Sequence, residues 1–250
     1  MAFRLARTIA LTSLAALALA ACGGSATGDG TAEQPVVAKV TAPAGKVWSD
    51  VAARSADGGL LVGNPEAPIK IIEFASLTCG ACAQFSADSG DELKKDFIDS
   101  GRVSFELRHF LRNPIDLLAA SVIQCAPVDR QYALASNILA SQQELFAGAE
   151  TGGAGAQAAM ANEADPARFA KAAQALGISA MFQSRGMAAD QVNACLGNAA
   201  SVEKLVADNN QWNEAFKIAG TPTFVINGQV ADGIVGWPAL RDRLRTMGAR

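Results

Sequence analysis

The stretch EFASLTCGACAQF, residues 73–85, joins an apolar run to a helix-prone one through two cysteines three positions apart. The apolar run itself, residues 69–76, is rich in β-branched and aromatic side chains and follows a proline, so we expect a buried strand. After the first cysteine, apolar residues recur at helical spacing, at Cys82, Phe85, Leu93 and Phe97. The sequence therefore predicts a strand that leads into a helix, with the cysteine pair at the start of that helix.

A second strand is expected over residues 101–110, which completes a β-α-β unit. Gly90 interrupts the helix between the strands and suggests a kink, because glycine in a helix costs about 1 kcal/mol relative to alanine. Upstream of this unit we expect a short helix over residues 47–56, followed by a turn at residues 63–65.

Residues from about 114 to 217 are rich in alanine and show mainly helical periods. The glycine-rich residues 148–157 predict a flexible break, and Asp165-Pro166 predicts a helix start in which Asp caps and Pro begins the helix. This segment therefore reads as a block of helices.

Two strands are expected after the helical block, on either side of Asn227-Gly228, which is a strong hairpin signal. A helix over residues 237–247 closes the chain. The order β-α-β, helical block, β-β-α predicts an α/β protein with a thioredoxin fold and a large helical insertion at about 114–217.

The N-terminal segment reads as an export signal, because two arginines precede an apolar stretch and small residues. It ends in LAAC, which resembles a bacterial lipobox, whose cysteine, here Cys22, is acylated. Five cysteines is an odd number for an exported chain, and acylation leaves four. We expect a lipoprotein signal peptide over 1–21, a flexible tether over 22–45 and a folded domain over 46–250, anchored in the bacterial cell envelope and facing the periplasm. Ordinary cleavage after Ala20 is the alternative and gives a soluble periplasmic or secreted protein.

The charge of the chain limits its partners. Its 250 residues carry a formal net charge of −3, which gives no basic surface for a nucleic-acid backbone. We therefore expect no nucleic-acid partner.

The cysteine pair has unequal surroundings. Cys79, at the helix N-terminus, faces unpaired N–H groups and the positive end of the helix dipole, which favour the thiolate. We expect Cys79 to be the exposed nucleophile. Cys82, one turn inside the helix, should be more buried and should attack a mixed disulfide to expel the partner's thiol.

Other readings of this pair stay open. A structural zinc site needs four protein ligands and the chain has one histidine, so we expect no resident metal and no cofactor. Copper(I) needs fewer ligands than structural zinc, and two thiolates with help from Met181 or Met187 could bind it in a carrier protein. An inert disulfide is the third reading.

Three features in this order carry a family resemblance: the strand before CGAC at a helix start, the helical insertion, and Thr221-Pro222 opening the next strand. They resemble the DsbA-like family of exported thioredoxin-fold thiol-disulfide oxidoreductases, from about Gly58 to the C-terminus. The resemblance implies an enzyme that exchanges disulfides with exported, cysteine-containing client proteins. It further implies that Pro222 is a cis-proline facing the sulfurs and that Thr221 lies against them and helps to set the redox potential.

Glu73 lies in the otherwise apolar strand before the cysteines. An ionised carboxylate is costly to bury, so its pKa should rise, which suits proton transfer to or from Cys82. The resemblance also implies a buried acid at this position. The alternative is a glutamate at the strand edge that reaches solvent.

Two further cysteines, Cys125 and Cys195, fall in the helical block. The resemblance and an oxidising compartment imply a structural disulfide between them, and buried free thiols are the alternative. His109 reads as structural, because the active-site histidine of the family lies between the two cysteines, where this chain has Ala81.

Gly80 and Ala81 stand where DsbA-like oxidases commonly carry Pro-His. The missing imidazole removes one thiolate-stabilising partner, which makes the disulfide a weaker oxidant. Oxidase, isomerase and reductase therefore stay open. We favour an oxidant that is reoxidised by a membrane or periplasmic redox partner. Isomerases of this fold usually dimerise through an extra N-terminal domain, and the stretch before Gly58 is too short for one, so we expect a monomer.

Overall fold

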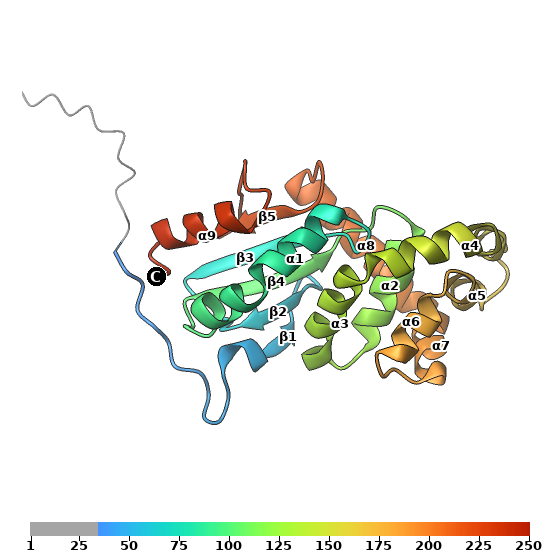
Figure 1. Cartoon of the computed structure of the whole chain (residues 1–250), viewed down its shortest axis with the longest axis horizontal. Helices are drawn as coiled ribbons and strands as arrows, with labels where there is room; N and C mark the ends of the chain where they lie inside the picture. Colours follow the sequence, from blue (N-terminus) through green and yellow to red (C-terminus); the bar gives the residue numbers. More distant parts are fainter. Residues whose placement is uncertain (1–34) are drawn as a thin grey trace, which may run out of the picture. The chain divides into compact units, whose positions relative to one another are not determined.

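The computed structural model describes residues 35–250, so the predicted signal peptide, Cys22 and the first part of the tether lie outside the described residues. In the described part, six strands form one mixed sheet in the order β1-β2-β4-β3-β5-β6 (Figure 1). The strands are β1 (Ala52–Arg54), β2 (Leu60–Gly63), β3 (Ile69–Ala75), β4 (Val103–His109), β5 (Thr223–Ile226) and β6 (Gln229–Val230).

The helices fall into two groups. Those outside the insertion are the 3-10 turn η1 (Trp48–Asp50), α1 (Gly80–Glu92), its π-helical continuation η2 (Leu93–Ile98) and α9 (Trp237–Thr246). Those of the insertion are α2 (Pro114–Cys125), α3 (Val128–Ala140), α4 (Gln142–Ala161), α5 (Arg168–Ala175), α6 (Ile178–Ser184), α7 (Ala189–Gly197) and α8 (Ala199–Phe216). Helices α4 to α7 gather at one side of the molecule, away from α9 (Figure 1).

Strand β3 is paired on both edges. It runs parallel to β4, with Ile69 opposite Val103, and antiparallel to β5, with Ile71 opposite Ile226. A central strand with hydrogen-bonded neighbours on both sides is held firmly in position. The loop with the cysteine pair follows the carboxyl end of this strand.

Helices α1 and α9 cover one face of the sheet. Phe85 of α1 packs against Phe224 of β5 with ring centroids 4.7 Å apart, and Phe97 of η2 meets Trp237 of α9 edge-on at 5.5 Å. Complete burial of each such side chain contributes roughly 1.5–3 kcal/mol. These contacts between the apolar face of α1, the sheet and α9 hold the start of α1 in position.

Helix α8 covers the other face. Phe74 of β3 is fully buried against Trp212 and Phe216, with ring centroids 6.1 and 5.3 Å apart. Because neighbouring residues of a strand point to opposite faces, Phe74 faces α8 and Glu73 faces α1.

Most predicted elements are confirmed: both strands of the β-α-β unit, the helical insertion, the hairpin around Asn227-Gly228 and the closing helix. Two differ in detail. Helix α5 begins at Arg168, because Asp165 forms a turn with Ala167 first. The irregularity expected at Gly90 takes the form of the π-helical segment that starts at Leu93.

The predicted helix over residues 47–56 is wrong. One 3-10 turn is followed by β1, which forms a hairpin with β2 through a turn at Gly58, where φ is +87°. Strand β2 then pairs with β4, with Leu60 opposite Leu107. This pairing partner is distant in the sequence, so the local pattern does not encode it.

The predicted break over residues 148–157 is also wrong, because this segment lies inside α4. A Cβ atom at Gly148 or Gly152 would collide with the carbonyl oxygens of Leu176 and Ala175 at the end of α5. The glycines therefore allow close contact between two helices, and this contact outweighs their low helix propensity.

Residues 35–45 of the predicted tether contain neither helix nor strand. Within them, Val37 donates a backbone hydrogen bond to Gly248 and Val40 donates one to Ser100, both at 3.0 Å. This part of the segment therefore lies against the domain.

A disulfide joins Cys125, the last residue of α2, to Cys195 of α7, with Cα atoms 5.7 Å apart. The two cysteines are separated by 70 residues, so the bond closes a long loop. It links the first helix of the insertion to one near its end.

We predict that the variant with Cys125→Ala and Cys195→Ala is less stable by about 4 kcal/mol, because the unfolded chain loses a cross-link over a long loop. Urea denaturation of the oxidised proteins measures this difference. Thiol reactivity of Cys79 should stay as in the parent chain, which serves as the control. Equal denaturation midpoints would show that the bond does not stabilise the insertion.

Candidate active site

Cys79 is the N-cap residue of α1, and Cys82 lies one turn inside the same helix. Both are free thiols. Cys79 is 6% exposed and Cys82 is 0% exposed. Cys79 is therefore the more exposed of the two, as expected, but it is itself buried. The reason is that its thiol donates a hydrogen bond to the Thr221 carbonyl at 3.1 Å and lies against that loop.

The surroundings of the two thiols shift their pKa values in opposite directions. Burial alone would raise the pKa of Cys79, but contacts with the side chains of Thr221 and Cys82 and with the backbone N–H groups of Ala81 and Cys82 together lower it below the usual value. The pKa of Cys82 is raised, chiefly by burial and then by the nearby charges of Glu73 and Cys79. At neutral pH the negative charge therefore favours Cys79.

Glu73 is buried in β3, with 4% of its surface exposed. Burial, and then the charge of Cys79, raises its pKa to about 8. Its Oε1 atom has no hydrogen-bond partner in the described part of the chain. A cavity of about 10 Å³ lies beside it, lined in part by Tyr132 and Ser136, and this is room for about one water molecule. Glu73 thus lies inside the fold. The alternative of a glutamate at the strand edge that reaches solvent is wrong.

The Thr221-Pro222 peptide bond is cis and lies directly before β5. The Thr221 hydroxyl is buried and lies beside the Cys79 sulfur. Strand β5 pairs with β3, so this loop lies next to the loop that follows β3. The pairing explains how the Thr221 carbonyl reaches Cys79.

The insertion contributes contacts to the cysteine loop that sequence reasoning missed. Asp116, buried near the start of α2, accepts hydrogen bonds from the Ser76 hydroxyl at 2.9 and 3.0 Å and from the Thr78 backbone at 3.0 Å. Asn113 caps α2 and also donates to the Thr78 hydroxyl at 2.8 Å. The N-cap signal of Asn113-Pro114 was visible in the sequence.

Gln142 gives a second link between insertion and loop. Its side-chain amide donates to the carbonyl oxygens of Leu77 and Cys79, both at 2.8 Å. A buried glutamine at the first turn of a helix has no distinctive sequence signal, so this contact could not be predicted.

His109 is buried at the end of β4, opposite Ala75. Burial, and then the charge of Arg54, lowers its pKa to about 4, so the imidazole is neutral at physiological pH. This environment suits the structural reading of His109.

Residues 35–250 contain no cluster of three or more His, Cys, Asp or Glu side chains able to hold a metal ion. Every helix in the same range is too short or too polar to cross a bilayer.

Comparisons with known proteins agree with this geometry. A family model described as Thioredoxin matches residues 55–244. The crystal structure of a protein-disulfide isomerase from Novosphingobium aromaticivorans is similar, with a TM-score of 0.70, 29% identity, and coverage of 76% of this chain and 97% of that one. The crystal structure of Wolbachia pipientis alpha-DsbA1 shares the fold, with a TM-score of 0.50, 24% identity, and coverage of 69% and 75%.

Among curated proteins, the "Putative protein-disulfide oxidoreductase" of Rickettsia felis is 26% identical over 172 residues, which are 69% of this chain and 54% of that protein. The chain spans about half the length of the curated relatives it matches. The family model covers strands β2 to β6, the cysteine pair, the insertion and the cis Thr221-Pro222 bond. The chain therefore belongs to the thioredoxin family, and its fold, with the helical insertion, is similar to that of alpha-DsbA1.

Proposed function

We propose that this chain is a protein-disulfide oxidoreductase that acts on exported proteins by dithiol-disulfide exchange. The observation that carries the proposal is the opposite shift of the two thiol pKa values at one helix start. A thiol with a lowered pKa attacks or leaves as a thiolate, and one with a raised pKa keeps its proton until it is needed. Cys79 is then the nucleophile and Cys82 the resolving cysteine.

In the oxidising direction, a client thiolate attacks the Cys79 sulfur of the Cys79–Cys82 disulfide, and the Cys82 sulfur leaves with the bonding electron pair. A second client thiolate then attacks the client sulfur of the mixed disulfide, which forms the client disulfide and releases Cys79 as a thiolate. The client loses two electrons and the cysteine pair gains them. A membrane or periplasmic redox partner takes them up in turn.

Glu73 serves as the proton donor and acceptor for Cys82 in this scheme. The effect of the Glu73 charge on Cys82 supports it, since that charge raises the pKa of the thiol. With a pKa of about 8, Glu73 holds a proton at neutral pH and can pass it to the leaving thiolate of Cys82.

The oxidising direction is favoured by the thiolate environment of Cys79, because a stabilised reduced form makes a stronger oxidant. The Gly80-Ala81 dipeptide lacks the imidazole of the common Pro-His pair, so the oxidant is a moderate one. The equilibrium reduction potential separates the directions. A value above about −200 mV supports an oxidant, and a value near about −270 mV supports a reductase.

The same proposal places the protein at the bacterial cell envelope, facing the periplasm. The lipobox-like LAAC ending at Cys22 supports a lipid anchor, with a signal peptide over 1–21, a tether over 22–45 and the enzyme domain over 46–250. It acts there as a monomer on clients that carry cysteines.

We predict that iodoacetamide at pH 6 modifies Cys79 of the reduced protein at least about tenfold faster than Cys82, because the thiolate forms at Cys79. Peptide mass spectrometry of timed samples measures both rates. The Cys79→Ser variant is the control and should be modified slowly. Faster labelling of Cys82 would reverse the two roles.

We expect the Cys82→Ser variant to accumulate mixed disulfides with an exported protein that carries a disulfide. The Cys79 thiolate attacks the client disulfide, one client sulfur leaves as a thiolate, and no second thiol of the enzyme resolves the intermediate. Non-reducing electrophoresis after acid trapping detects these adducts. A variant with both Cys79→Ser and Cys82→Ser should form none. If Cys82→Ser forms no more adducts than this control, the exchange mechanism is refuted.

The Glu73→Gln variant should be more stable than the parent chain, by roughly 4 kcal/mol at pH 8. Between about pH 4.5 and 8 the unfolded parent chain releases the Glu73 proton while the folded chain keeps it, so parental stability falls as pH rises. The gain from glutamine should therefore be small near pH 4.5 and large at pH 8. Urea denaturation at both pH values measures it.

The exposed Glu66→Gln variant is the control and should not change this pH dependence. The same Glu73→Gln variant should resolve mixed disulfides at least about tenfold more slowly, since Cys82 loses its proton acceptor. An equal gain in stability at both pH values would contradict the buried, titrating carboxyl group.

A further inference from the structure

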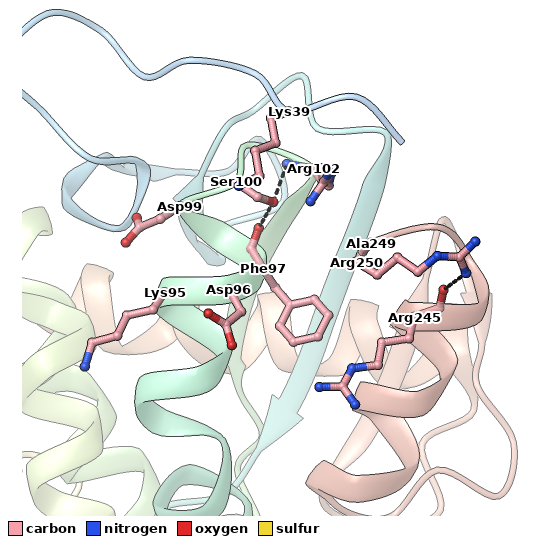
Figure 2. Close-up of a pocket in the computed structure, with 10 residues that line it drawn as sticks. All are labelled: Lys39, Lys95, Asp96, Phe97, Asp99, Ser100, Arg102, Arg245, Ala249 and Arg250. Carbon is pink, nitrogen blue, oxygen red and sulfur yellow. Dashed lines mark hydrogen bonds between the residues drawn. The ribbon is translucent and has the colours of Figure 1, made fainter. Parts of the chain in front are cut away.

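A basic pocket of about 480 Å³ lies at the end of the sheet opposite the cysteine pair. Five basic and two acidic side chains line it, and Figure 2 shows Lys39, Arg102 and Arg245 around it. Because β3 and β4 are parallel, Arg102 precedes the amino end of β4 while Cys79 follows the carboxyl end of β3. At about 3.3 Å per residue, these strands separate the two sites by roughly 20 Å.

Arg102 is the central group of the pocket. Its side chain is largely buried, with 6% of the residue exposed, and its Nε atom donates to the Val37 carbonyl at 2.5 Å. Among residues 35–250, no carboxylate forms a salt bridge with it. A guanidinium carries five N–H donors, and a buried charge without a partner is costly. The other donors of Arg102 are therefore available to an anion in the pocket.

Two further cations line the pocket from separate parts of the chain. Lys39 belongs to the N-terminal segment, which backbone hydrogen bonds of Val37 and Val40 hold against the domain. Arg245 lies on α9, where it also bonds to Glu92 at 3.0 Å. One of the two acids, Asp99, accepts a hydrogen bond from the Ser49 backbone at 2.7 Å. The pocket is thus locally positive in a chain whose net charge is −3.

We propose that this pocket binds a phosphate group. The fork of an arginine matches phosphate oxygens in a two-pronged geometry, and a neighbouring lysine adds a point charge. The source that the position favours is a phospholipid head group, because the chain that leads back to the proposed anchor at Cys22 enters the domain here, where Val37 bonds to Gly248. Binding at this end directs the cysteine pair away from the bilayer.

Two probes distinguish the possible sources. Inorganic phosphate is titrated calorimetrically into the full chain against chloride at equal ionic strength. Vesicles of phosphatidylcholine, with or without phosphatidylglycerol, are sedimented with the full chain carrying Cys22→Ser, so that no acyl group contributes. We expect phosphate binding and tighter binding to the vesicles that contain phosphatidylglycerol.

Two variants and a matched control test the site. Lys39→Gln removes one exposed charge, and Arg102→Lys keeps its charge but loses the fork. Each should weaken binding about five- to tenfold. Lys171→Gln removes an equal charge from α5, which does not line the pocket, and should leave binding unchanged. Circular dichroism melts verify that each variant is folded.

The possible outcomes distinguish a lipid head group from a soluble phosphate compound, and both from the absence of a phosphate site. Weakening of both phosphate and vesicle binding by the pocket variants supports the lipid head group. Phosphate binding that the pocket variants weaken, without vesicle binding, supports the site with a soluble phosphate compound as its ligand. Absence of phosphate binding, or equal weakening by Lys171→Gln, would overturn the proposal. The exchange activity plays no part in these measurements, so the site and the proposed function succeed or fail separately.

Discussion

The hydrogen bond from the Cys79 thiol to the Thr221 carbonyl is the contact around which the molecule is organised. It joins residues 142 positions apart, and the whole helical insertion lies between them. The insertion must leave the sheet after β4 and return the chain beside β3, so that β5 can pair there. The sheet order, with β5 next to β3, brings the two residues together. The position of the cysteine pair is therefore a product of tertiary structure as much as of a local motif.

Two buried acidic groups, Glu73 and Cys82, share one apolar region beneath the helix start. Each carries its proton at neutral pH because burial disfavours its charge, and the charge of Glu73 further disfavours a thiolate at Cys82. The arrangement makes the fold less stable than an apolar pair would, and in the proposed exchange it supplies a proton for the Cys82 sulfur. Groups that destabilise the folded state in this way are common at catalytic sites.

The elements that the sequence predicts correctly are those whose signal is local. The strand over 69–76, the cysteines at the helix start and the Asn227-Gly228 hairpin depend on neighbours within a few positions. The hairpin of β1 and β2 and the helical state of residues 148–157 depend on distant partners, and the sequence pattern misled there. In the site, Glu73 stood out as an acid in an apolar strand. Asp116 and Gln142 did not, because their partners are backbone groups of a loop far away in the chain.

The glycines of α4 link helix packing to the cysteine loop. Gly148 and Gly152 let α4 touch the end of α5, and the same helix begins at Gln142, whose amide holds two carbonyl groups of the cysteine loop. Any larger side chain at either glycine would push α4 outward as a rigid rod and pull its first turn away from Cys79. A displacement at one end of α4 would therefore be transmitted to its other end. The position of Cys79 thus restricts which residues can replace Gly148 and Gly152, although both lie far from the thiols.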